Sequence, residues 1–174
     1  KDVFKRKYVR FSDKFSEWKT AVQGVLPPFG GGRSCQDGYA DDIIHLMDEL
    51  GLYSEYIPGI LLAHAKPGKY VQSVGIALTI FEQPIEFRKW DGRIKAVFVL
   101  ATVDNHAHFN ALQTLMKVLA EEEIRGMISD ATGAGIVWTG FLTILSRKNR
   151  CLNHEKWCER NDGKLDSGDM FGDG

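Results

Sequence analysis

The sequence has little of what marks secreted, membrane-spanning or nucleic-acid-binding proteins. Its 174 residues include three cysteines, Cys35, Cys151 and Cys158, which are too few and too scattered for a secreted disulfide framework. No apolar run approaches the ~20 residues that a membrane helix needs, and the basic N-terminal stretch lacks the apolar segment of a secretory signal. The formal net charge is −1, so no global basic field attracts nucleic acid or an anionic membrane. We therefore expect a cytoplasmic protein without nucleic-acid partners and without direct membrane insertion.

The common cofactor and metal motifs are missing as well. The sequence has no P-loop, dinucleotide fingerprint, GxSxG or HExxH motif. The glycines at 30–32 are not followed by Lys-Ser/Thr in P-loop spacing, and they predict a flexible loop. Cys151, His154 and Cys158 lack a fourth ligand at the spacing of a zinc site, so we interpret the thiols as free. We expect neither a metal nor an organic cofactor.

Strand-like and helix-like apolar patterns alternate along the chain, which predicts an α/β fold. The length suits one domain with one core, and the 44% of apolar residues is ordinary for a globular protein. We expect Ser16 to cap the first helix and Pro84 to end a strand. The expected strands are 3–11, 60–63, 71–81, 85–87 and 94–102, the expected helices are about 16–25, 37–50 and 109–123, and residues 136–145 fit a helix or a strand.

The composition changes from about Ser146 onward. The rest of the chain is polar and rich in Gly and Asp, with few candidates for a core. We expect a single domain over residues 1–146 and a poorly ordered polar tail or linker over residues 147–174.

His64 stands where a predicted buried strand gives way to a turn. The strand is 60–63, and the turn contains Lys66, Pro67 and Gly68. Catalytic side chains are often presented in this way, by a loop held on a rigid strand. The alternative is a histidine at the rim of the core whose hydrogen bonds are satisfied there.

His106 and His108 follow the apolar strand 94–102 and open a helix. A helix N-terminus has N–H groups without helical partners and the positive end of the helix dipole, which together bind anions. We expect Asp104 or Asn105 to cap this helix. The alternative is that the two histidines only decorate its first turn.

Three stretches together resemble enzyme IIA of the bacterial sugar phosphotransferase system, of the mannitol/fructose type and its ascorbate-like branch. They are PGILLAHAKPG, VGIALTIFEQPIEF and IKAVFVLATVDNHAHFNALQTLMKVLAEE. In that family the active histidine sits in a phrase like "pgiAlPHArp", and a later strand ends in "LAA-D--sHl--L--L". The pair Gly38-Tyr39 and the phrase GLYSEYIPG also fit, and the similarity covers about Phe15 to Leu145. The resemblance implies the mannitol-type fold, a mixed β-sheet flanked by helices on both faces.

The resemblance also assigns roles to individual residues. His64 matches the phosphoacceptor, and His108 matches the second active-site histidine, whereas His106 is two residues early and matches less well. Asp104 matches the acidic position between strand and helix. Lys66 stands where the branch usually has Arg, so the positive charge is kept but the bidentate fork to phosphate is lost.

The activity implied is that of a phosphoryl carrier, a transferase of the kinase type that serves sugar transport. His64 would accept a phosphoryl group from phospho-HPr, a small carrier protein, and pass it to a IIB component. The IIB component would pass the group on to the sugar inside the IIC membrane permease. Lys66 and Asp104 would support the phosphate site. Ile60, Leu61 and Phe109 would form an apolar docking rim for both partners or belong to the ordinary core.

Two other functions are compatible with the same fold. One is a regulatory module, in which the phosphorylated histidine reports sugar status instead of feeding transport. The other is a non-catalytic scaffold domain without histidine chemistry. The spacing of His64 and His108 favours the carrier over the scaffold.

Overall fold

A β-sheet with helices on both faces makes up the first of two units in this chain. The computed structural model describes residues 4–12, 15, 17–26, 32–50, 55–86, 93–144 and 146–147. The two units are Lys1–Trp138 and Thr139–Gly174. The fold below is that of the first unit, and in the second unit residues 139–144 are helical. The predicted domain boundary at residue 146 stays a prediction.

The sheet is mixed, as predicted. Its five strands lie in the order β1-β4-β5-β3-β2. The pairs β1–β4 and β3–β5 are parallel, whereas β4–β5 and β2–β3 are antiparallel. The strand bounds are β1 (Phe4–Ser12), β2 (Glu55–Ile57), β3 (Ile60–His64), β4 (Gly75–Glu86) and β5 (Arg93–Ala101).

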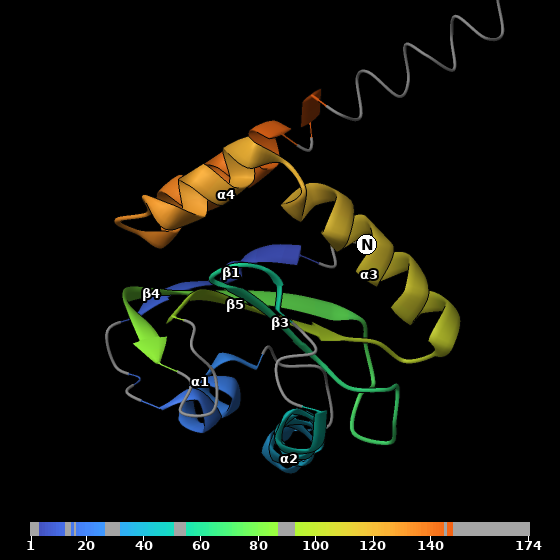
Figure 1. Cartoon of the computed structure of the whole chain (residues 1–174). Helices are drawn as coiled ribbons and strands as arrows, with labels where there is room; N and C mark the ends of the chain where they lie inside the picture. Colours follow the sequence, from blue (N-terminus) through green and yellow to red (C-terminus); the bar gives the residue numbers. More distant parts are fainter. Residues whose placement is uncertain are drawn as a thin grey trace, which may run out of the picture. The chain divides into compact units, whose positions relative to one another are not determined.

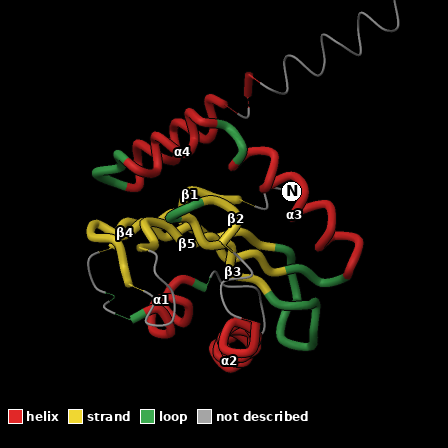
Figure 2. Tube along the Cα trace, viewed as in Figure 1, coloured by secondary structure: helices red, strands yellow, loops and turns green. Residues whose placement is uncertain are grey.

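Two helical layers enclose this sheet. Helices α1 (Trp18–Val25) and α2 (Gly32–Leu50) cover one face (Figure 1). Helices α3 (Asn105–Leu119) and α4 (Glu122–Ser129) cover the other face. Figure 2 shows the strands as a yellow layer between the red helices. The prediction of an α/β fold with helices on both faces of the sheet is therefore confirmed.

Strand β5 lies in the middle of the sheet and is buried on both faces, which explains its almost continuous apolar sequence. Val97 and Val99 belong to the core cluster that also holds Ile43 of α2. Because side chains alternate along a strand, Phe98 and Leu100 lie on the opposite face, toward α3 and α4. Both are fully buried.

The same alternation places His64 on a defined face of the sheet. Leu61 and Ala63 of β3 belong to the core cluster with α2. Ile60, Leu62 and His64 therefore point to the face that α3 and α4 cover. His64 is the last residue of β3, so its ring emerges at the carboxyl end of the strand on the side of α3.

The prediction that Pro84 ends a strand is wrong. Strand β4 runs through Pro84 to Glu86, so residues 85–86 of the separate strand expected at 85–87 belong to β4, and Phe87 lies outside the described residues. The β4–β5 register shifts between Ile80 and Ile85. Proline is tolerated in a sheet at such an irregularity, because no ladder N–H is needed there.

Helix boundaries also differ from the predictions. α2 begins at Gly32 rather than near residue 37, since no proline separates the two positions and an established helix propagates readily. The N-cap of α1 is Glu17, and Ser16 lies outside the described residues. The helix expected over 109–123 is two helices, because α3 stops at Leu119 and α4 starts anew. Residues 136–144 are helical.

Candidate functional site

The structure brings His64 and His108 face to face. His64 ends β3 and pairs with Leu100 near the end of β5. Because β3 and β5 are parallel neighbours, their carboxyl ends meet at one edge of the sheet. Helix α3 starts just beyond β5, and His108 lies in its first turn. The centroids of the two imidazole rings are 5.3 Å apart, with an angle of 37° between the ring planes.

The His64 ring is oriented by its own strand. Nδ1 lies 2.9 Å from the backbone carbonyl oxygen of Leu62. A carbonyl only accepts, so Nδ1 carries the proton and Nε2 holds the lone pair of the neutral ring. Burial lowers the pKa of His64 from its ordinary value of 6.5, and the bond to the Leu62 carbonyl opposes that fall in part. His64 thus presents a neutral ring whose nucleophilic atom is Nε2.

His108 is held by a threonine. Nδ1 of His108 lies 3.0 Å from the hydroxyl oxygen of Thr102, and Thr102 is completely buried at the end of β5. Burial lowers the pKa of His108, and the positive charge that His64 would carry lowers it further. Desolvation therefore favours the neutral form of both imidazoles.

Asp104 caps α3. Its Oδ1 accepts a hydrogen bond of 2.7 Å from the Ala107 amide, as expected for an N-cap side chain. The structure therefore places this carboxylate in the capping role. By holding the first turn of α3, Asp104 also holds the backbone of His108, whose amide bonds to the Asp104 carbonyl at 3.0 Å.

His106 is not part of the pair. It is exposed, and its Nε2 lies 3.0 Å from Nδ2 of Asn110 one turn further along α3. Lys66 is exposed and lies two residues after His64 in the chain. The structure thus brings the rings of His64 and His108 together, and Asp104 caps the turn that carries His108.

The three apolar candidates for a docking rim separate into two kinds. Ile60 and Leu61 are buried and belong to the core. Phe109 is 63% exposed and follows His108 directly. It lines a shallow groove of about 340 Å³ on α3 together with Leu112, Gln113, Met116, Lys117 and Ala120. Only Phe109 therefore qualifies for a docking surface.

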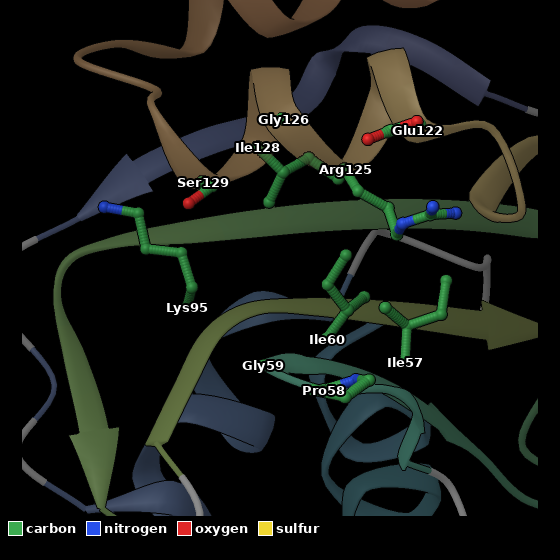
Figure 3. A pocket seen from close by; sticks show the side chains of 10 residues that line it. All are labelled: Ile57, Pro58, Gly59, Ile60, Lys95, Glu122, Arg125, Gly126, Ile128 and Ser129. Atoms are coloured by element: carbon green, nitrogen blue, oxygen red, sulfur yellow. The ribbon is translucent and has the colours of Figure 1, made fainter.

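A second hollow, of about 550 Å³, lies between α4 and the start of β3 (Figure 3). Ile60 begins β3, so this hollow is at the end of the strand opposite His64. Arg125, which lines it, donates to the carbonyls of Leu119 and Ala120. Lys95 donates to the Glu82 carbonyl at 3.2 Å. Both cationic side chains thus donate hydrogen bonds to backbone carbonyls. The hollow is separate from the histidine pair.

Two buried hydroxyls near the histidines were not among the predicted site residues. One belongs to Thr102, and the other belongs to Tyr39 of α2, which is 1% exposed and bonds to backbone at the ends of β3 and β5. For Thr102 a signal existed, because it stands where the family phrase "LAA-D" has alanine. For Tyr39 the pairing Gly38-Tyr39 was noted, but nothing in its spacing indicates where the hydroxyl points.

The residues that the structure describes contain neither a membrane-spanning helix nor a metal-binding cluster. None of the helices there is long and apolar enough to cross a membrane. In the same residues, no three His, Cys, Asp or Glu side chains are grouped so that they would hold a metal ion. The motif formed by Cys151, His154 and Cys158 lies outside the described residues.

Curated proteins with similar sequences include mannitol-specific and ascorbate-specific enzyme IIA components. The "Mannitol-specific cryptic phosphotransferase enzyme IIA component" of Escherichia coli (strain K12) is 27% identical over 123 residues, which make up 71% of this chain and 84% of that protein. The "Ascorbate-specific PTS system EIIA component" of Shigella boydii serotype 4 (strain Sb227) is 23% identical over 119 residues, or 67% of this chain and 77% of that protein.

Solved structures share the fold. The solution structure of the mannitol-specific cryptic phosphotransferase enzyme IIA CmtB from Escherichia coli has a TM-score of 0.66 and 24% identity, and covers 80% of this chain and 95% of that one. The enzyme IIA chain in a complex of mannitol IIA with phosphorylated mannitol IIB from Escherichia coli has a TM-score of 0.59 and 15% identity, covering 80% and 99%.

The mixed sheet between two helical layers is the fold of phosphotransferase-system IIA proteins. Residues 2–139 match the family described as "Phosphoenolpyruvate-dependent sugar phosphotransferase system, EIIA 2". The chain belongs to this family and is a phosphotransferase-system enzyme component, as the resemblance implies.

Proposed function

We propose that the chain accepts a phosphoryl group from phospho-HPr on Nε2 of His64 and passes it to a IIB component for sugar uptake. The observation that carries the proposal is the facing pair of imidazoles, whose ring centroids are 5.3 Å apart. A neutral imidazole is nucleophilic, and a second imidazole beside it supplies a hydrogen-bond donor without a further positive charge. This arrangement suits reversible transfer between proteins.

The transfer step follows from the tautomer of His64. The lone pair on Nε2 forms a bond to phosphorus, the N–P bond of the donor histidine breaks, and the donor ring keeps that electron pair. The Nδ1 proton stays in its bond to the Leu62 carbonyl, which stabilises the positive charge that the ring gains. Little covalent work is left to the protein, so positioning and charge stabilisation dominate the catalysis.

His108 is assigned the role of stabilising the transferred group. With Nδ1 engaged by Thr102, the Nε2–H of His108 is the donor that bonds a phosphoryl oxygen. Lys66 contributes positive charge at the rim, as a point charge rather than a fork. Asp104 supports the site indirectly, because its cap holds the turn of α3 that carries His108.

The partners follow from the family and from one relative. The family is named for a phosphoenolpyruvate-dependent system, and the mannitol IIA from Escherichia coli was solved in complex with its phosphorylated IIB. We assign a IIB component as the acceptor and HPr as the donor, both acting in the cytoplasm. The exposed Phe109 beside His108 gives each carrier in turn an apolar contact next to the reacting nitrogen.

One experiment tests the function directly. The protein is incubated with phosphoenolpyruvate, enzyme I and HPr, and its intact mass is measured. We expect a gain of one phosphoryl group that is lost in His64→Ala. The matched control is His45→Ala, since His45 is an exposed histidine of α2 that lies 3.3 Å from Glu49, and it should still gain the group. No gain in the unchanged protein, with carriers of verified activity, rules out the carrier and favours the scaffold.

A further inference from the structure

The hydroxyl of Tyr39 joins the two strand ends that build the site. Tyr39 lies on α2 with its side chain fully inside the core. Its Oη donates to the Leu100 carbonyl at 2.7 Å and accepts from the Ala65 amide at 3.1 Å. Leu100 is the β5 partner of His64, and Ala65 is the next residue after it. A single hydroxyl thus binds backbone directly beside His64 on one strand and opposite it on the other.

The two hydrogen bonds of Tyr39 lie at the end of the β3–β5 ladder and connect the strands one residue beyond it. The last paired residues are His64 and Leu100, and the chain leaves the sheet at Ala65. A buried amide or carbonyl left without a partner costs about 1–3 kcal/mol. By serving both groups, the Tyr39 hydroxyl keeps the backbone at Ala65 in register with β5 one step beyond the strand.

The neighbouring glycine holds the same loop from the same helix. A Cβ atom built on Gly38 would lie 2.5 Å from the ring of Tyr70, so only glycine lets that ring lie against α2. Tyr70 packs on the core cluster and belongs to the segment 65–74 that follows His64. Adjacent residues of α2 therefore hold this segment in two places.

We infer that Tyr39 is a positioning residue for phosphoryl transfer, one that keeps Nε2 of His64 aimed at the incoming phosphorus with its ring opposite His108. The inference rests on the proposed function. In this role Tyr39 acts through the main chain. It acts through the Ala65 amide and the Leu100 carbonyl, which fix the main chain from which the His64 ring projects.

The test is Tyr39→Phe, which keeps the buried ring and removes the hydroxyl. We expect the maximal rate of phosphorylation by phospho-HPr to fall roughly 10- to 100-fold, as small misplacements of reacting groups do. KM for phospho-HPr should stay within about twofold, because the surface around Phe109 is unchanged. The matched control is Thr79→Val, which removes another buried hydroxyl, one on β4 with no hydrogen-bond partner among the described residues. It should transfer at the unchanged rate.

Nuclear magnetic resonance supplies a readout that does not depend on transfer. In the unchanged protein the Ala65 amide should exchange as slowly as the interior amides of β3, and ¹⁵N shifts should show one His64 tautomer. In Tyr39→Phe the Ala65 amide should exchange faster, and the His64 nitrogens should show mixed tautomers.

The outcomes separate the two proposals. If phospho-HPr does not phosphorylate the native protein, the carrier function is overturned and with it the role of Tyr39, even when the Ala65 amide is protected from exchange. A fast-exchanging Ala65 amide in the native protein overturns the Tyr39 role alone, whether or not Tyr39→Phe folds. Transfer by Tyr39→Phe at the native rate, or an equal loss in Thr79→Val, overturns it too.

Discussion

The hydroxyl of Thr102 lies 3.0 Å from Nδ1 of His108, and the ring of His108 faces the ring of His64 with 5.3 Å between the centroids. We assign the hydroxyl as the donor, which leaves the proton of the neutral His108 ring on Nε2. His64 has its proton on Nδ1 because a carbonyl faces that atom. One ring therefore presents a lone pair and the other an N–H, which are the nucleophile and the oxygen-binding donor that phosphoryl transfer needs.

Thr102→Val should slow the transfer, because it removes the hydroxyl and keeps the β-branched shape. Without that donor the His108 proton is no longer held on Nε2, and we expect a roughly tenfold lower rate of phosphorylation. Thr102→Ser keeps the hydroxyl and should recover most of the rate. Stopped-flow transfer from phospho-HPr measures both, and a serine variant as slow as the valine variant contradicts the assignment.

His108→Ala and His106→Ala form a matched pair on one helix. His108→Ala should lower the phosphorylation rate roughly 100-fold, since it removes the donor beside His64. His106→Ala should change it less than about twofold, because His106 is exposed and interacts with Asn110 instead. A time course of mass gain distinguishes them, and equal or reversed effects mean that the wrong histidine was assigned.

Much of this site follows from local sequence patterns. The continuous apolar run of β5 and the short run of β3 predict strands that are buried on both faces. When two such strands are parallel neighbours, whatever follows them meets at one edge, and in this chain those residues are His64 and His108. Asp104 is predictable as a cap because its type and its place before a helical stripe are local properties.

The parts that were not predicted depend on partners distant in the sequence. Tyr39 reads as one more apolar residue of α2, and its hydroxyl bonds across 61 residues to Leu100. Thr102 reads as the last residue of a strand. β2 has three residues, too few for a period to show. Pro84 suggests a strand end until the register shift of β4 against β5 is known.

Two substitutions of Asp104 separate the effect of its capping hydrogen bond from the effect of its negative charge. Asp104→Ala should lower the free energy of unfolding by about 1 kcal/mol, because the Ala107 amide loses its acceptor. It should also slow phosphorylation, since the turn that carries His108 loosens. Asp104→Asn keeps an acceptor oxygen at the same place and should retain both stability and rate. Urea unfolding and the transfer assay check these outcomes, and an asparagine variant as impaired as the alanine variant argues for a role of the charge itself.

A substitution of Phe109 separates the docking of phospho-HPr from the transfer step itself. Phe109→Glu should raise KM for phospho-HPr about tenfold, because an exposed aromatic ring beside the site is replaced by a charge. The maximal rate should be kept. Leu50→Glu is the control, as Leu50 is 59% exposed at the end of α2. A fall in maximal rate without a change in KM contradicts docking at Phe109.

The buried state of His64 predicts how the activity responds to acid. Desolvation lowers the pKa of His64 below 6.5, so the ring stays neutral and nucleophilic at pH values where an exposed histidine is protonated. Phosphorylation should therefore hold its rate as the pH falls to about 6.5 and decline only below it. A pH profile of single-turnover transfer measures this. A decline centred above pH 6.5 contradicts the desolvated neutral ring.

The same shift fixes the sign of the effect on stability. The folded pKa of His64 is below its unfolded value of 6.5, so between the two values the unfolded chain binds more protons. The free energy of unfolding must then fall as the pH drops from about 6.5 through the folded pKa, and this contribution is fully present above 6.5. His64→Gln removes the titration and should flatten that part of the profile, whereas His45→Gln, on the surface of α2, should not. Urea unfolding at several pH values tests this prediction. If the free energy of unfolding of His64→Gln depends on pH as steeply as that of the unchanged protein, the fold does not hold the ring neutral.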